Sequence, residues 1–279
     1  MCIRDRYAEF VDLNKLGAVV TKGVANVPWP GNPTPRVAEV YGGMLNAVGL
    51  QNPGIDLFVE RDIPFLKQFD TKIMVNVCGH STEEYIEVVE RLRDQPVDLL
   101  EINISCPNVK EGGIAFGQDP KAVEAITKEM KKHAAQPVIM KLSPNVTDIT
   151  EMARAAEAGG ADGLSLINTI TGMKIDINRQ KFVLANKTGG MSGPAIHPVA
   201  VRMVYQTAQA VRLPIVGMGG IMNAEDAIEM ILAGATAVSV GTANFTNPHV
   251  TEEIVAGIRD YMERYQVADI RDLVGAVHE

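Results

Sequence analysis

Cys106 is the residue of this sequence whose surroundings most strongly suggest chemistry. It lies in the stretch Asn103-Ile-Ser-Cys-Pro-Asn108, just after an apolar run, and the glycine-rich loop 111–117 follows it. A cysteine in a reducing compartment is more often a buried, inert thiol, but asparagines and a proline surround this one. Such a cysteine is suited to act as a nucleophile or as a base. Cys78 and Cys2 lack a comparable polar setting, so we rank Cys106 above both.

Several apolar runs of strand length end at an amide, a hydroxyl or an ammonium group. These residues are Lys22, Asn76, Asn103, Lys141, Asn168 and Thr169. Burying such a group costs free energy unless a polar partner meets it. One of them alone is more often a satisfied structural residue, whereas six at equivalent places indicate a ligand. If the strands are parallel, all six share one rim.

The last two apolar runs end in glycines, at Gly217-Met-Gly-Gly220 and at Gly241-Thr242. Glycine lets the backbone approach an anion closely, and the N-terminus of a following helix favours negative charge. In barrels, the loops after the seventh and eighth strands are the usual phosphate site. We therefore expect a phosphate-bearing ligand with Lys141 near its head group. Flavin mononucleotide (FMN) suits so amide-rich a rim better than a bare sugar phosphate does.

Seven apolar runs, each followed by a helical pattern, predict strands buried on both faces, as in parallel sheets. The runs are Leu16–Thr21, Ile73–Val77, Val97–Ile104, Pro137–Leu142, Gly163–Ile167, Pro214–Gly217 and Ala237–Val240. Repeated strand–helix alternation favours an α/β fold of the TIM (β/α)8 barrel type. Such a barrel needs eight strands. Either 171–194 hides one, or the first strand is missing through N-terminal truncation, which is the interpretation we prefer.

Capping signals mark the helices between these runs. Ser81 and Glu84 form a capping-box pattern, and Asp148 and Asn223 are suited to N-cap positions. Glycines at 159–160 and at 234 stand where helices end.

Two segments, 23–70 and 170–194, are too long to be simple connections. In a barrel, insertions of this kind usually follow strands at the C-terminal face and cover the active site. Surface decoration is the plainer interpretation for any one loop. We expect a single barrel domain over 1–279, with both insertions over the active-site face.

Composition excludes several classes of protein. The 279 residues (30.1 kDa) are 46% hydrophobic and carry a net charge of −8, with scattered basic residues, which argues against a nucleic-acid surface. No apolar run is long enough to cross a membrane, and the N-terminus lacks the apolar core of a secretory signal. The three cysteines have no metal-ligand spacing, so we expect neither a disulfide framework nor a metal site. This cysteine usage predicts a cytoplasmic location.

Together these motifs resemble the class 1 dihydroorotate dehydrogenases, specifically the B-type catalytic subunit. The matching stretches are Val20-Thr-Lys-Gly23, Gly31-Asn-Pro-Thr-Pro-Arg36, 43–54, 103–117, Lys141-Leu-Ser-Pro-Asn145, Leu166-Ile-Asn-Thr169, Gly190-Met-Ser-Gly-Pro194, Gly217-Met-Gly-Gly-Ile221 and Val240-Gly-Thr242. They run in the family's order through most of the chain. The loop Val109-Lys-Glu-Gly-Gly113 is similar to the B type and unlike the A type.

The resemblance implies a role for each matching position. Cys106 would be the catalytic base that takes a proton from C5 of dihydroorotate while hydride leaves C6 for FMN, and Lys22 would stabilise developing negative charge. The implied FMN contacts are Lys22, Gly23, Asn76, Asn103, Lys141, Ile167, Gly193, Gly219, Gly220, Gly241 and Thr242. The implied substrate contacts are Lys22, Asn46, Ala47, Val48, Gly49, Leu50, Asn103, Asn168 and Thr169.

The resemblance also implies partners. The B type is expected to be a homodimer within a heterotetramer, joined by a subunit that carries FAD and a [2Fe–2S] cluster and reduces NAD in pyrimidine biosynthesis. This sequence has neither a dinucleotide-binding Gly-x-Gly-x-x-Gly after a strand nor a cysteine set for a cluster. Family members begin earlier, with a first strand and turn that are absent here, and Met1–Arg6 matches nothing in the family.

Three alternatives stay open. A flavin barrel like that of dihydropyrimidine dehydrogenase shares a Ser-Cys-Pro motif but differs in the loop that follows. A flavin-free, phosphate-binding isomerase or aldolase explains the terminal glycines but not the amide-lined rim. An inactive scaffold subunit is compatible with the missing strand.

Overall fold

The computed structural model describes residues 7–105 and 116–278, and its centre is a seven-stranded parallel sheet. In spatial order the strands are β1 (Ala18–Val20), β4 (Lys72–Val77), β5 (Leu99–Asn103), β6 (Val138–Lys141), β7 (Gly163–Leu166), β12 (Ile215–Met218) and β13 (Ala237–Ser239). Each coincides, within two residues at either end, with one of the seven predicted runs. The predicted α/β barrel type is confirmed, as a curled sheet of seven strands.

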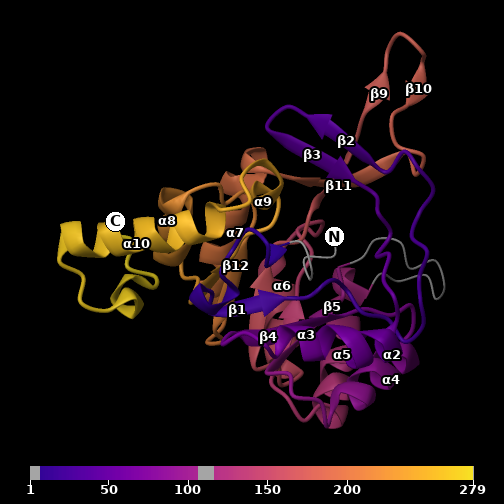
Figure 1. Ribbon diagram of the computed structural model, residues 1–279, viewed down its shortest axis with the longest axis horizontal. Helices are drawn as coiled ribbons and strands as arrows, with labels where there is room; N and C mark the ends of the chain where they lie inside the picture. The colour runs from indigo at the N-terminus through magenta and orange to yellow at the C-terminus, as the bar shows by residue number, and fades with distance from the viewer. Residues whose placement is uncertain (1–6, 106–115, 279) are drawn as a thin grey trace.

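Helices follow the strands and cover the outside of the parallel sheet (Figure 1). The main ones are α4 (Thr82–Leu92), α5 (Pro120–His133), α6 (Ile149–Ala158), α7 (His197–Ala210), α8 (Ala224–Leu232) and α10 (Val250–Tyr265). Short helical segments complete the described chain: η1 (Leu13–Lys15), α2 (Ile55–Leu57), η2 (Phe58–Asp62), α3 (Ile63–Leu66), η3 (Phe116–Gln118), η4 (Pro194–Ile196), α9 (Ala243–Thr246) and η5 (Ile270–Leu273). One face of each strand is buried against the helices, and the other face is buried inside the curled sheet. Burial on both faces explains why the apolar runs are continuous.

Within the described residues the sheet stays open between its edge strands β1 and β13. Polar contacts nevertheless join the segment before β1 to helix α10, which follows β13. The backbone N–H of Asp12 donates to Oε1 of Glu252 at 2.8 Å, and Lys15 lies 3.1 Å from Oε2 of the same carboxylate. These contacts hold the segment before β1 against the helix that begins after β13.

The predicted capping residues are confirmed, with one difference of partner. Ser81 accepts from the N–H of Glu84, Asp148 from that of Thr150, and Asn223 from that of Asp226. Glu84, however, does not complete the capping box on Ser81, because its carboxylate accepts from the N–H of His80 at 2.7 Å.

The two long predicted insertions meet in a second sheet, of order β2-β3-β11-β8. Strands β2 (Val37–Val40) and β3 (Gly43–Asn46) come from the first, and β8 (Ile170–Met173) and β11 (Thr188–Ser192) from the second. All its pairings are antiparallel, and Asn46 of β3 lies opposite Gly190 of β11. A hairpin of β9 (Ile175–Asp176) and β10 (Lys181–Phe182) extends beyond it (Figure 1). The described strands in 171–194 thus belong to this sheet or to the hairpin, and none of them joins the parallel sheet.

The main core fills the space between the parallel sheet and its helices. Its fully buried members include Tyr85, Ile102, Met130 and Leu164. In the part of the chain that the structure describes, none of the helices has the length and apolarity to span a membrane.

Candidate active site

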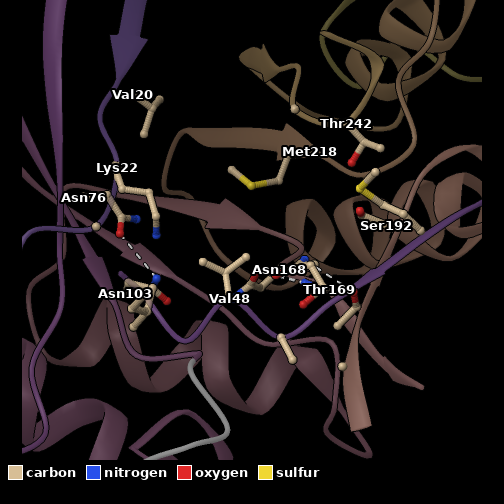
Figure 2. Close-up of a pocket in the computed structure, with 18 of the residues that line it drawn as sticks. Val20, Lys22, Val48, Asn76, Asn103, Asn168, Thr169, Ser192, Met218 and Thr242 are labelled. Atoms are coloured by element: carbon tan, nitrogen blue, oxygen red, sulfur yellow. Dashed lines mark hydrogen bonds between the residues drawn. The ribbon is translucent and has the colours of Figure 1, made fainter. Parts of the chain in front are cut away.

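A cavity of about 1180 Å³ lies at the C-terminal ends of the parallel strands, beneath the second sheet. The predicted residues that line it are Lys22, Gly23, Asn46, Ala47, Val48, Gly49, Leu50, Asn76, Asn103, Lys141, Ile167, Asn168, Thr169, Gly219, Gly220, Gly241 and Thr242. Gly193 lies beside the lining residue Ser192 and does not belong to the wall itself. Cys106 lies outside the described residues, although Ser105 directly before it is buried. Figure 2 shows Lys22, Asn76 and Asn103 on one side of the cavity, with Val48 between them and the pair Asn168 and Thr169.

Strand register places the polar side chains of the barrel interior next to one another. Asn76 of β4 lies opposite Glu101 of β5, and Asn103 of β5 lies opposite Lys141 of β6. Lys141 in turn lies opposite Ser165 of β7. Because side chains alternate along a strand, Glu101 and Asn103 share the inner face.

A chain of hydrogen bonds connects the amides of this wall. Nδ2 of Asn168 donates to the hydroxyl of Ser105, which donates to Oδ1 of Asn103 at 2.6 Å. Nδ2 of Asn103 donates to Oδ1 of Asn76 at 3.3 Å, and Nδ2 of Asn76 donates to a carboxylate oxygen of Glu101. Every bond runs toward Glu101, which has no exposed surface.

Two lysines bring positive charge to this wall. Lys141 Nζ lies 3.6 Å from Oε2 of Glu101, and 17% of the lysine side chain is exposed. Lys22 follows β1, and its side chain extends toward Asn76 and Asn103 (Figure 2). An anionic or electron-rich ligand in the cavity would meet both ammonium groups.

The glycine turn after β12 packs so tightly that side chains are excluded from it. Gly219 and Gly220 have φ values of +130° and +70°, and a Cβ on Gly220 would lie 2.7 Å from Cβ of His197. The imidazole of His197 lies 2.9 Å from the carbonyl oxygen of Gly219. At Gly241, by contrast, a Cβ would meet no atom within 4 Å, so the cavity is open there.

The loop after β3 forms the opposite wall, where the substrate contacts are expected. Gly49 and Leu50 have φ values of +73° and +51°, and the carbonyl of Val48 accepts from the N–H of Asn32 at 3.0 Å. Asn46, the last residue of β3 before this loop, donates to the carbonyl of Gly190 at 3.4 Å, which ties the start of the loop to β11 of the other insertion.

Several residues of the site were missed by sequence reasoning. Glu101 is the most important, and a charged residue in the middle of the apolar run 97–104 was the available signal. Trp29 lines the cavity and stacks on His80 with ring centroids 3.9 Å apart. Tyr7 also lines the cavity, and burial raises its pKa to about 12. Neither aromatic residue had a pattern that distinguished it from a surface residue.

Comparison with known proteins agrees with this geometry. A model of the family described as dihydroorotate dehydrogenase matches residues 1–262. The protein named dihydroorotate dehydrogenase B (NAD(+)), catalytic subunit, from Lachnoclostridium phytofermentans is 72% identical over 271 residues, 97% of this chain and 90% of the relative. Proteins of the same name from Alkaliphilus metalliredigens and Desulforamulus reducens are 64% and 55% identical, over 97% and 98% of this chain and 90% of each relative. The chain therefore belongs to the dihydroorotate dehydrogenase family, and its matches lie among the B-type catalytic subunits, as its motifs predict.

Proposed function

We propose that this chain oxidises (S)-dihydroorotate to orotate, with FMN as its cofactor, as a step of pyrimidine biosynthesis. One observation carries the proposal. A single cavity at the ends of the parallel strands brings together two lysines, a wall of asparagine amides and two glycine turns. Together with the family membership, this combination favours a planar, carbonyl-bearing substrate next to a phosphate-bearing cofactor.

The residues present fit an FMN molecule. The cavity of about 1180 Å³ exceeds the upper end of the usual range for small-molecule sites, roughly 1,000 Å³, so it has room for a flavin and a substrate together. The open space at Gly241 and the tight turn at Gly219–Gly220 leave backbone groups available to a phosphate. Asn76, Asn103 and Lys141 would hold the ring system. When bound, FMN would supply the acceptor for the hydride that leaves C6 of dihydroorotate.

The protein's own part in the reaction is to remove a proton and to stabilise charge. Cys106, three residues after the end of β5 at Asn103, would take the proton from C5, so that a C5–C6 double bond forms as hydride leaves C6. A cysteine suits this task because its ordinary pKa, about 8.5, is close to neutral pH. Lys22 would stabilise negative charge that develops on the substrate.

Asn46, Asn168 and Thr169, with the backbone of 47–50, would hold the pyrimidine ring and its carboxylate. Amide groups suit this edge because each offers a donor and an acceptor. Closure of the cavity by the loops around β3 and β11 would keep water away from the reacting carbons.

Electrons would leave through a second subunit. The relatives are named as NAD(+)-linked catalytic subunits, which supports a partner that carries the path to NAD. We propose a homodimer of this chain within a heterotetramer whose other subunit holds FAD and a [2Fe–2S] cluster. A cytoplasmic location stays a prediction from cysteine usage.

A visible spectrum tests the proposed function. The purified protein, reconstituted with FMN, should be yellow with an absorption band near ~450 nm, and anaerobic dihydroorotate should bleach that band. Bleaching by dihydropyrimidines instead of dihydroorotate would favour the dihydropyrimidine dehydrogenase-like alternative. A protein that binds no flavin would contradict the proposal and favour one of the two flavin-free alternatives, the phosphate-binding isomerase or aldolase and the inactive scaffold subunit.

A further inference from the structure

We infer that Glu101 is a positioning residue: its carboxylate fixes the amide orientation of the cavity wall, so that the wall presents N–H donors to ring carbonyl oxygens. The inference rests on the proposed function for the identity of the ligands. Its basis is the hydrogen-bond chain from Asn168 to Glu101, the burial of that glutamate and the contact with Lys141.

The chemistry of Glu101 allows one direction for the chain. An ionised carboxylate accepts hydrogen bonds and cannot donate them. Glu101 accepts from Nδ2 of Asn76 and from the hydroxyl of Ser165 at 2.7 Å, and Lys141 lies 3.6 Å away. With donors and an ammonium around it, this buried side chain is satisfied as an anion. Asn76 must therefore turn its nitrogen toward Glu101 and its oxygen toward Asn103.

The orientation of Asn76 in turn fixes the orientation of the next asparagine in the wall, Asn103. Since Oδ1 of Asn76 faces Asn103, Asn103 must present its nitrogen there and its oxygen to Ser105. The N–H of Ser105 also donates to that oxygen at 3.3 Å, which gives the same orientation. At the far end, Oδ1 of Asn168 accepts from the N–H of Thr169 at 2.9 Å.

The result is a cavity wall that presents hydrogen-bond donors and no free amide oxygens from these three asparagines. All three asparagine oxygens are engaged within the protein, whereas the chain uses one of the two hydrogens on each Nδ2. Because all three asparagines line the cavity, their remaining hydrogens can meet a ligand. Such a wall selects acceptor atoms, and both the pyrimidine ring of a flavin and orotate carry ring carbonyl oxygens.

The experiment replaces the anion with its neutral isostere. In Glu101→Gln, the new amide can donate to Asn76 as well as accept from it, so the chain can run in either direction. Loss of a charged hydrogen-bond acceptor corresponds to roughly tenfold to hundredfold weaker binding. We expect this loss in the dissociation constants of FMN for the apoprotein, by fluorescence, and of orotate for the FMN-loaded protein, by difference absorbance.

Two further variants separate orientation from general stability. Ser165→Ala removes another bond to the same carboxylate but leaves the asparagine chain intact, so FMN should bind within about threefold of wild type. Glu101→Asp retains the charge on a shorter side chain and should bind FMN with intermediate affinity. Thermal melting of each apoprotein reports stability separately from ligand affinity.

The outcomes are distinguishable. Wild-type protein that binds no FMN would refute the proposed function itself. Wild-type protein that binds FMN, with Glu101→Gln within twofold of it for both ligands, would refute only the role of Glu101. If Glu101→Gln does not fold, the comparison of Glu101→Asp with Ser165→Ala decides: weaker FMN binding by the aspartate variant supports the role, and equal binding overturns it.

Discussion

The imidazole of His197 connects the glycine turn of the cavity to the surface helix α8. Its Nδ1 lies 2.9 Å from the carbonyl oxygen of Gly219, and its Nε2 lies 3.2 Å from Oε2 of Glu229. A carbonyl oxygen can only accept, so Nδ1 carries the hydrogen. Since Gly220 packs against Cβ of the same histidine, one side chain supports both glycines of the turn.

The effect of substituting His197 on FMN binding should therefore depend on whether the new side chain keeps an N–H near the position of Nδ1. Asparagine places an N–H near the position of Nδ1, so His197→Asn should retain the bond to Gly219 and bind FMN nearly as wild type. His197→Leu loses that bond and should bind FMN roughly twofold to tenfold more weakly, the effect of one net hydrogen bond. Fluorescence titration of the apoproteins measures both. Equal affinities of the two variants would remove this histidine from the support of the turn.

A methyl group at Gly241 should reduce FMN affinity without destabilising the apoprotein. A Cβ there meets no protein atom within 4 Å, yet the residue lines the cavity, so the methyl group would occupy space needed by the ligand. Overpacking of this kind costs about 1–3 kcal/mol, which corresponds to roughly fivefold to 150-fold in affinity.

Gly17 provides the matched control for this substitution. A Cβ at Gly17 also meets no atom within 4 Å, and the residue lies outside the cavity wall. Gly17→Ala should leave both the melting temperature and the FMN dissociation constant unchanged. If Gly241→Ala behaves in the same way, the phosphate end of the ligand does not lie at this turn.

Asp98 should stabilise the fold at neutral pH, where its carboxylate is ionised, and should lose this contribution at acidic pH. Burial by itself would raise its pKa, but the N–H of Ile73 and the ammonium of Lys72 outweigh this and hold the pKa below its usual value. A carboxyl group with a lowered pKa in the folded state stabilises the fold above its unfolded pKa, about 3.9. That contribution is lost as the pH falls through the folded value.

Urea unfolding of wild type and Asp98→Asn at several pH values tests this dependence. At pH 7 the variant should be less stable by on the order of 1 kcal/mol, and the difference should shrink below pH 4. Asp94→Asn, at an exposed position nearby, is the control and should show little difference at either pH. A constant deficit for Asp98→Asn from pH 7 to pH 3 would contradict the ionic origin of the effect.

The parallel sheet could be predicted because its strands carry the strongest signal in the sequence. Each is a short, continuous apolar run that ends in a polar or glycine residue, and the structure confirms all seven. The second sheet could not be predicted in this way. Its strands are short and partly exposed, and Asn46 and Gly190, which lie opposite each other, are 144 residues apart. No local pattern specifies a pairing over such a distance.

The candidate site was predictable as a set of residues but not as a network. Polar strand ends identified Asn76, Asn103 and Lys141, because parallel strands bring their C-terminal ends to one rim. The direction of the hydrogen bonds among them depends on Glu101, which became visible only when register placed it opposite Asn76. His197 was missed for a similar reason, because its contact with Gly219 joins the first residue of α7 to a turn 22 residues further along the chain.

Cys106→Ala should separate proton removal from ligand binding. The thiol is proposed as the base at C5, so its loss should reduce turnover at neutral pH by roughly a hundredfold or more, the usual contribution of a positioned base. The amides and lysines that are proposed to hold FMN remain, so the variant should stay yellow with an unchanged FMN dissociation constant. Cys106→Ser replaces the thiol with a far weaker acid, so its residual turnover should increase toward high pH. Anaerobic stopped-flow measurement of flavin bleaching by dihydroorotate gives these rates directly. Near-normal bleaching by the alanine variant at pH 7 would assign the base to another residue, whereas loss of flavin would indicate that position 106 acts on the fold of the cavity.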